Sequence, residues 1–373
     1  MATHLVGGEM SYRCLGGNQY EITLTIFRDD YYGQATLDPT ARITIFRNGS
    51  NSVLRTEDIN LLGGGGTILP LDANPCITNR PRDVRIEKGI YKKVITLPAN
   101  TLGYKIVYQR CCRNDAAANI NNGLGSTYMV NIPNTNLCNN SPTFDNQPPL
   151  FLCANSKLDF DMSATDADGD QLVYSLVAPL QGLDEFSPRI CDAFDGCNLQ
   201  QSAPPPYDSI YYLDGYTSQE PLGPTSTIYL NPTTGILTTI PKTVGLFVVG
   251  IQVQEIRAGV VLSSNIRDFQ FNVTNCSVNS SVPIVITDNS PNSAIQVNDT
   301  TFSNCQGNIV RFDNGVNQRA LSYFWDFGVP SLTNDTSNLK NPTYTYADTG
   351  TYYVTLIINK GNPCSDTSRI KVV

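Results

Sequence analysis

The sequence predicts an all-β protein built from tandem antiparallel sandwich domains. Short runs of alternating apolar and polar residues recur along the chain, as in YEITLTIF (residues 20–27) and QLVYSLV (residues 171–177). Charged residues make up only 16% of the 373 residues, while glycine (28) and proline (23) are abundant, so the composition disfavours long helices. Strands that alternate with period two and are separated by frequent turns are typical of a sandwich.

Charge and cysteine content exclude several functional classes. The chain carries 33 acidic and 25 basic residues, and no basic run supplies the cationic face that nucleic acid requires. The chain has eleven cysteines but only one histidine, His4, so we do not expect a zinc site. We expect the cysteines to form disulfides in an oxidising compartment. No apolar run is long enough to span a membrane. We therefore expect an exported protein whose signal peptide was removed, and a longer parent chain.

Three β-rich blocks are expected as domains. The first, residues 1–140, contains runs such as YEITLTIF and YKIVYQR. The second, residues 141–280, holds a long insertion loop at 182–227 that interrupts its strand pattern. The third, residues 281–373, ends in the strand-like run SRIKVV.

The third block contains the most specific motif. YFWDFG (residues 323–328) and NPTYTYADTGTYYVTLII (residues 341–358) resemble the PKD repeat, an immunoglobulin-like sandwich of extracellular proteins. The resemblance implies that Trp325 fills the core together with Tyr323 and Phe327. It also places Tyr352, Val354, Leu356 and Ile358 inward on one strand. The family pattern continues with Asp-Gly after WDFG, whereas this chain has Val329-Pro330, so that turn is not carried over.

The other two blocks resemble further extracellular modules. DADGDQLVYSL (residues 166–176) and NPTTGILTTIP (residues 231–241) are similar to cadherin-like and Ig-like bacterial modules. ATHLVGGEMSYRCLGG (residues 2–17) and QRCCRN (residues 109–114) resemble the N-terminal region of large Bacteroidota surface proteins. Those proteins carry PKD repeats, leave the cell by type IX secretion and include gliding-motility adhesins. The resemblance implies secretion across the outer membrane to the cell surface.

The run Asp166-Ala167-Asp168-Gly169-Asp170 is the candidate metal site. It is not an EF-hand, because counting from Asp166 places glycine at the fourth position and Val177 at the twelfth, where that loop needs glycine sixth and glutamate twelfth. The cadherin-like resemblance implies calcium, held by the run and by distant oxygens. The alternative is a solvated Asp/Gly turn. The candidate calcium ligands are Asp166, Asp168, Asp170, Glu255 and Asp268.

Disulfide pairing is only partly predicted. Cys111 and Cys112 are adjacent in a strand-like run, so their side chains would face opposite ways and bond different partners. Five cysteines in the first block leave one over, for which a free thiol, a bridge into the second block and an intermolecular bond are all open. The alternative for all of these cysteines is inert, buried thiols. The candidates in the first block are Cys14, Cys76, Cys111, Cys112 and Cys138. The pairs favoured elsewhere are Cys153–Cys276, Cys191–Cys197 and Cys305–Cys364.

The segment PPPYDSIYYLDGYTSQEP (residues 204–221) is the candidate recognition loop. Tyrosine offers a large contact area at low entropic cost, although the same side chains can simply pack the loop onto the sandwich. Asp208-Ser209-Ile210 also resembles a bacterial O-glycosylation motif, with Ser209 as the acceptor. The candidate recognition residues are Tyr207, Tyr211, Tyr212 and Tyr216.

These observations predict a non-enzymatic, secreted structural and adhesive protein. We expect it to form part of a disulfide-stapled rod or surface filament used for attachment or gliding. The expected partners are other surface proteins, polysaccharide or copies of itself. The sequence shows no GxSxG motif, and its one histidine lies at the terminus, so no catalytic triad is expected. The alternative is a carbohydrate- or ligand-binding accessory region of a larger secreted hydrolase.

Overall fold

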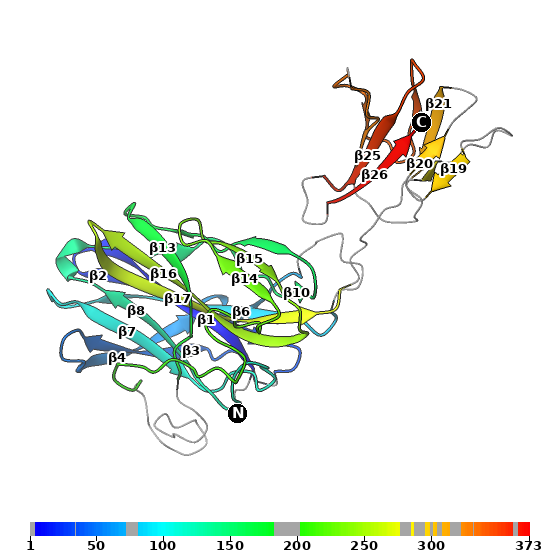
Figure 1. Ribbon diagram of the computed structural model, residues 1–373. Helices are drawn as coiled ribbons and strands as arrows, with labels where there is room; N and C mark the ends of the chain where they lie inside the picture. Colours follow the sequence, from blue (N-terminus) through cyan, green and yellow to red (C-terminus); the bar gives the residue numbers. More distant parts are fainter. Residues whose placement is uncertain are drawn as a thin grey trace. The chain divides into compact units, whose positions relative to one another are not determined.

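The computed structural model describes most of the chain and divides it into two compact units. The first unit comprises Met1–Asp72 and Pro81–Asn275, and the second contains Cys276–Val373 (Figure 1). The described residues are 4–33, 35–71, 81–182, 202–276, 285–286, 295–298, 301–303, 308–313, 322–330, 332–360 and 365–373.

Regular structure in these residues is almost entirely β, which confirms the predicted fold class. Within them the only helical segments are two 3₁₀ turns, η1 (Leu62–Gly64) and η2 (Thr135–Leu137). Neither is long or apolar enough to cross a membrane, and the described part of the chain has no other helix to consider.

One large sheet dominates the first unit. Its strands run in the order β13-β16-β17-β1-β2-β6-β4-β3-β7-β8, and two short strands pair at its side, β5 with β6 and β10 with β17. The strands are β1 (Leu5–Gly16), β2 (Gln19–Asp29), β3 (Thr40–Arg47), β4 (Val53–Leu61), β5 (Thr67–Ile68), β6 (Ile86–Thr96), β7 (Tyr104–Arg110), β8 (Ser126–Ile132), β10 (Leu152–Cys153), β13 (Gln171–Val177), β16 (Gly245–Arg257) and β17 (Val260–Thr274).

The sheet folds back on itself to enclose a core. Strand β8, at one end of the order, packs against β1 and β17 near the other end. The alternating inward residues of β1, β2, β3, β6, β7 and β8 form a single apolar cluster, in which Ile22, Leu24, Ile43, Ile106 and Val130 are fully buried. This pattern gives the strands one buried face and explains their period-two sequence.

The predicted domain boundary near residue 140 is not found. Strand β1 is hydrogen-bonded to β17, with Gly7 opposite Phe269 and Gly8 opposite Asp268, so residues from both predicted domains share one sheet. A Cβ atom at Gly7 would lie 2.0 Å from the carbonyl oxygen of Asp268, so this approach requires glycine. Alternation identifies strands but not their partners, which is why the sequence suggested a division here.

Smaller sheets complete the first unit. Strands β11 (Leu158–Asp161), β15 (Ile236–Ile240) and β14 (Thr227–Leu230) form one, and β9 (Thr143–Phe144) pairs with β12 (Ala164–Thr165). Of the predicted insertion loop, residues 183–201 lie outside the described residues. Residues 202–226 form no strand. They contact the main sheet, for example through the Ser202 N–H, which donates to Thr44 Oγ1 of β3 at 2.7 Å.

The second unit is a two-sheet sandwich around Trp325. One sheet has the order β18-β21-β24 and the other β19-β20-β26-β25-β22-β23. The strands are β18 (Val285–Ile286), β19 (Ile295–Asn298), β20 (Thr301–Ser303), β21 (Ile309–Asp313), β22 (Tyr323–Asp326), β23 (Thr336–Ser337), β24 (Thr343–Thr345), β25 (Tyr352–Ile358) and β26 (Asp366–Val372).

Trp325 occupies the core position that the motif predicts. It is fully buried, its ring centroid lies 5.5 Å from that of Phe312, and its Nε1 donates to the carbonyl of Leu339 at 2.9 Å. Val354, Leu356 and Ile358 are buried as predicted, while Tyr352 is half-buried against the same core. Burial of the indole with its N–H satisfied is the arrangement that makes tryptophan stabilising in a core.

Phe312→Ala is expected to destabilise the second unit by about 3–5 kcal/mol, because it empties a fully buried aromatic site beside Trp325. Trp325 is the only tryptophan in the chain, so its fluorescence during urea unfolding follows this unit. Leu332→Ala, at an exposed position, is the control. Equal urea midpoints for the two variants would contradict this account of the core.

Candidate metal centre

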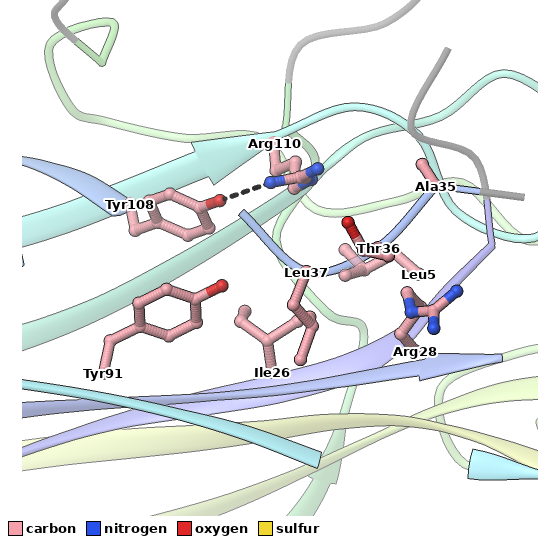
Figure 2. Close-up of a pocket in the computed structure, with 9 residues that line it drawn as sticks. All are labelled: Leu5, Ile26, Arg28, Ala35, Thr36, Leu37, Tyr91, Tyr108 and Arg110. Atoms are coloured by element: carbon pink, nitrogen blue, oxygen red, sulfur yellow. Dashed lines mark hydrogen bonds between the residues drawn. The ribbon is translucent and has the colours of Figure 1, made fainter. Parts of the chain in front are cut away.

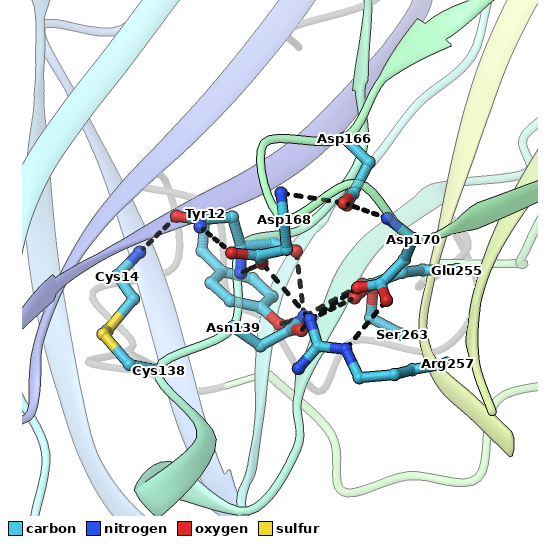
Figure 3. Close-up of polar contacts among 11 residues, drawn as sticks. Tyr12, Cys14, Cys138, Asn139, Asp166, Asp168, Asp170, Glu255, Arg257 and Ser263 are labelled. Atoms are coloured by element: carbon cyan, nitrogen blue, oxygen red, sulfur yellow. Dashed lines mark hydrogen bonds and ion pairs between the residues drawn. A yellow bond between two sulfur atoms is a disulfide. The ribbon is translucent and has the colours of Figure 1, made fainter.

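The acidic run forms a tight turn between β12 and β13. Asp166 Oδ1 accepts the backbone N–H groups of Asp168 at 2.9 Å and Asp170 at 3.0 Å. Gly169 has φ +79°, a left-handed conformation that glycine adopts without strain. The turn gathers the three carboxylates at one place (Figure 3).

Glu255 joins the three aspartates from a neighbouring strand. It lies on β16 opposite Leu172 of β13, and its side chain is fully buried. Oxygen atoms of Asp166, Asp168, Asp170 and Glu255 lie within 4.8 Å of one another. We call these four residues the carboxylate cluster. The sequence nominated Glu255 as a distant partner of the run, and the fold places it there.

Asp268 is not part of the carboxylate cluster. It is buried on β17 and forms an ion pair with Arg113, at 2.8 Å between Nη1 and Oδ1 and 2.6 Å between Nη2 and Oδ2. Removing one partner of a buried ion pair destabilises the fold, because the other charge is then buried without compensation. The carboxylate of Asp268 is therefore needed by Arg113. The prediction that Asp268 is a calcium ligand was therefore wrong. The sequence around Asp268 does not reveal Arg113 as its partner, which is why the prediction failed.

Arg257 supplies the positive charge at the cluster. Its Nε donates to Asp170 Oδ1 at 2.8 Å and its Nη2 to Asp170 Oδ2 at 2.5 Å, a two-point contact that holds the pKa of Asp170 below its usual range. Nη2 also lies 3.7 Å from Asp168 and 4.0 Å from Glu255 (Figure 3). One guanidinium thus contacts three of the four carboxyl groups, and its single positive charge leaves an excess of negative charge when all four are ionised.

Two buried oxygens of the cluster have no hydrogen-bond donor among the residues that the structure describes. Glu255 Oε2 accepts from Ser263 Oγ at 2.5 Å and from Asn139 Nδ2 at 2.9 Å, but Glu255 Oε1 has no donor, and neither does Asp166 Oδ2. Burial, reinforced by the neighbouring Asp170, raises the pKa of Glu255 to about 7. Buried acceptors normally have partners, so these two oxygens need a proton or a cation.

The donor set fits a hard divalent cation. Calcium takes 6–8 oxygen ligands, and carboxylate and amide oxygens are the ligands it prefers. The four carboxyl groups and the Asn139 side chain, whose Oδ1 accepts from Arg257 at 2.9 Å, supply such oxygens from three separate segments of the chain. A zinc or redox-metal site would need histidine or thiolate ligands, which the cluster lacks.

A disulfide anchors the segment beside the cluster. Cys14 and Cys138 are bonded, and Cys14 N–H donates to Asn140 Oδ1 at 2.9 Å. Asn140 in turn donates to Asp168 through its backbone N–H at 2.7 Å and its side chain at 3.0 Å. The neighbouring Asn139 reaches Glu255 and Tyr12. Strand β1 and the acidic turn are therefore connected through residues 138–140.

Sequence reasoning missed Asn139, Asn140 and Arg257. Asn140 lies 28 residues from Asp168, and Asn139 lies 118 residues from Arg257, so no local spacing connects them. The one available signal is the cysteine next to Asn139, because a predicted disulfide partner marks a segment that is held in place.

The other cysteine predictions have mixed outcomes. Cys111 and Cys112 are bonded to each other across a cis peptide bond, so the expectation of different partners was wrong. Strand β7 ends at Arg110, and the alternation on which that expectation depended does not extend to them. Cys153 and Cys276 are both disulfide-bonded. Cys76, Cys191, Cys197, Cys305 and Cys364 lie outside the described residues.

The tyrosines of the candidate recognition loop mostly pack inward. Tyr207 donates to the carbonyl of Ala203 at 2.6 Å, Tyr212 donates to that of Val248 at 3.3 Å, and Tyr216 packs on Phe247. Tyr211 is 74% exposed, and Ser209, the candidate glycosylation acceptor, is also exposed. Tyr212 and Tyr216 thus hold the loop on β16, and Tyr207 bonds within the loop, which leaves Tyr211 as the accessible contact.

A cavity elsewhere in the first unit is too small for a ligand. Its volume is about 20 Å³, roughly the space of one water molecule. Its two cations, Arg28 and Arg110, point toward it, but Arg28 pairs with Glu87 at 2.6 Å and Arg110 pairs with Asp38 and contacts Tyr108 (Figure 2). Its charges are neutralised, so the carboxylate cluster is the stronger candidate site.

Glu255→Gln is expected to flatten the pH dependence of stability in calcium-free buffer. The folded chain keeps the Glu255 proton between about pH 4.5 and 7, whereas the unfolded chain releases it, so the free energy of unfolding falls as pH rises through this window. Calorimetric melting of the first unit at pH 5.5 and pH 8 measures the effect, with Glu220→Gln, at an exposed glutamate, as the control. Equal pH slopes in wild type and Glu255→Gln would contradict the burial of an uncompensated carboxyl group.

Comparisons with known proteins find a similarity for the second unit. Residues 291–373 match the family model of the PKD domain. No curated protein matches the chain. A Dscam structure from a study of isoform specificity shares 8% identity, with 98% of this chain and 72% of that chain covered and a TM-score of 0.18. Drosophila N-cadherin EC1-4 shares 11% identity, with 96% and 83% covered and a TM-score of 0.20. The C-terminal unit is thus similar to PKD domains.

Proposed function

We propose that the chain is a non-enzymatic structural and adhesive region of an extracellular protein displayed at the cell surface. The match of residues 291–373 to the PKD domain carries this proposal, because that fold is typical of extracellular, non-catalytic modules. Disulfide-bonded cysteines in the first unit add support, since such bonds persist in oxidising compartments. Tyr211, exposed on an anchored loop, offers one contact for a partner.

The finer proposal is a place in a surface filament or rod used for attachment or gliding. The N-terminal motifs that resemble Bacteroidota surface proteins support it, as does the type IX secretion route implied by the same resemblance. Other surface proteins, polysaccharide or further copies of the chain are the partners this role requires. No step of the proposed role needs an active site.

Calcium is the proposed ligand of the carboxylate cluster. Asp166, Asp168, Asp170 and Glu255 would hold the ion, and it would balance the negative charge that Arg257 leaves uncompensated. The ion would supply rigidity, because its ligands come from the acidic turn and from β16. Two buried oxygens without donors, Glu255 Oε1 and Asp166 Oδ2, are the observation that supports it.

Calcium is expected to raise the melting temperature of the first unit. A ligand that binds only the folded state at 100 times its Kd stabilises that state by about 2.7 kcal/mol, and removing a carboxylate ligand by Asp168→Asn should abolish most of this gain. Scanning calorimetry with calcium and with chelator measures the shift. Asp159→Asn, at an exposed aspartate on β11, is the matched control. A chelator-insensitive melting temperature in the wild type would argue against a calcium site.

Loss of the protein from its source cells is expected to reduce their attachment to surfaces, and re-expression should restore it. Intact cells treated with a membrane-impermeant label should also label this chain. Growth on polymeric substrates distinguishes this function from the alternative, an accessory region of a secreted hydrolase. Loss of such a region would impair polymer degradation and leave attachment unchanged. A chain protected from the external label would contradict surface display.

A further inference from the structure

The outward face of the six-stranded sheet in the second unit carries several cations. In the register of β22, β25 and β26, Phe324 lies opposite Ile357, and Tyr353 lies opposite Lys371. Since successive residues of a strand point to opposite faces and Trp325 is buried, Phe324 points outward. Arg369 and Lys371 flank the buried Ile370 on β26 and therefore also face outward.

Two of these cations lie over aromatic rings. Lys360 Nζ is 3.4 Å from the ring centroid of Phe324, and Arg369 Cζ is 4.8 Å from that of Tyr353, which is itself 49% exposed. A ring attracts a cation through its quadrupole but carries no net charge, so it positions the cation without neutralising it. We call Lys360, Arg369, Lys371, Phe324 and Tyr353 the cation face.

The positive charge of the cation face is largely uncompensated. No carboxylate lies within ion-pair distance of Lys360, Arg369 or Lys371 among the residues that the structure describes. On the described outward positions of β22, β25 and β26, the single carboxylate is Asp326, whose Oδ1 accepts the N–H of Gly328 at 2.9 Å. Three cations therefore face one carboxylate, on a chain whose formal charge is −8.

We propose that the cation face binds an acidic polysaccharide, one whose sugar units bear carboxylates or sulfates. This inference rests on the proposed surface function and names a partner class for it. Arg369 and Lys371 lie two residues apart on one strand, about 7 Å, so an open sheet face presents repeated cations to a linear polymer. Charge complementarity selects an anionic ligand, and guanidinium N–H groups suit carboxylate and sulfate oxygens.

Duplex nucleic acid fits this face less well. DNA-binding proteins with strong salt dependence typically neutralise about 6–10 phosphates, whereas the cation face offers three cations. The acidic charge of the whole chain would also oppose a long polyphosphate. A short contact with a polyuronate segment requires fewer cations.

Affinity electrophoresis of the full chain through gels containing polygalacturonate, dextran sulfate or neutral dextran tests the proposal. Both acidic polymers should retard the wild type, in a salt-dependent manner, and neutral dextran should not. The double variant Arg369→Gln/Lys371→Gln should lose at least fivefold in affinity. Arg311→Gln/Lys340→Gln removes the same two charges from exposed positions elsewhere in the unit and should bind as the wild type does.

Three results would overturn the inference: no retardation by either acidic polymer, equal losses in the two double variants, or duplex DNA binding as tightly as polygalacturonate. Trp325 emission and the urea midpoint of the second unit verify that each variant is folded. If polymer binding fails while cells lacking the protein still attach poorly, this inference is wrong and the proposed function stands. If cells lacking the protein attach normally but the acidic polymers bind the chain, the proposed function is wrong and this inference stands.

Discussion

The pairing of β1 with β17 is the constraint on which the first unit depends. It joins the N-terminal strand to a strand about 260 positions later, through a contact so close that Gly7 has no room for a side chain. Since β17 also pairs with β16, and β16 with β13, this junction sets the position of Glu255 relative to β1. The Cys14–Cys138 bond and Asn140 then connect β1 to the acidic turn.

The disulfide and the carboxylate cluster act on the same part of the fold. A bond that closes a loop with a sequence separation of 124 residues restricts the unfolded chain and is worth about 4–5 kcal/mol in the chain-entropy description. Part of that stability offsets the cost of burying Glu255 beside three aspartates. The proposed cation would lower this cost further, because it would balance the negative charge of the ionised carboxyl groups.

Sequence reasoning succeeded where the signal was local. The Trp325 motif identified the core of the second unit, and Asp166-Ala167-Asp168-Gly169-Asp170 forms the turn that its Asp/Gly composition indicates. It failed where long-range pairing decided the outcome. Nothing near Gly7 reveals β17, and nothing near Asp268 reveals Arg113, so a domain boundary and a ligand were wrongly assigned. Glu255 was the exception, because it follows a conspicuous apolar strand.

The central claim is that the carboxylate cluster is a cation site of an extracellular structural module. Titration calorimetry of the metal-free chain with calcium at pH 7.5 tests it most directly. The account predicts a saturable event with one calcium per chain that disappears in Glu255→Gln and persists in Glu220→Gln. No saturable heat in the wild type, or unchanged binding in Glu255→Gln, would contradict it. Arg257 would then be the only counter-charge that the described part of the chain offers to the four carboxyl groups.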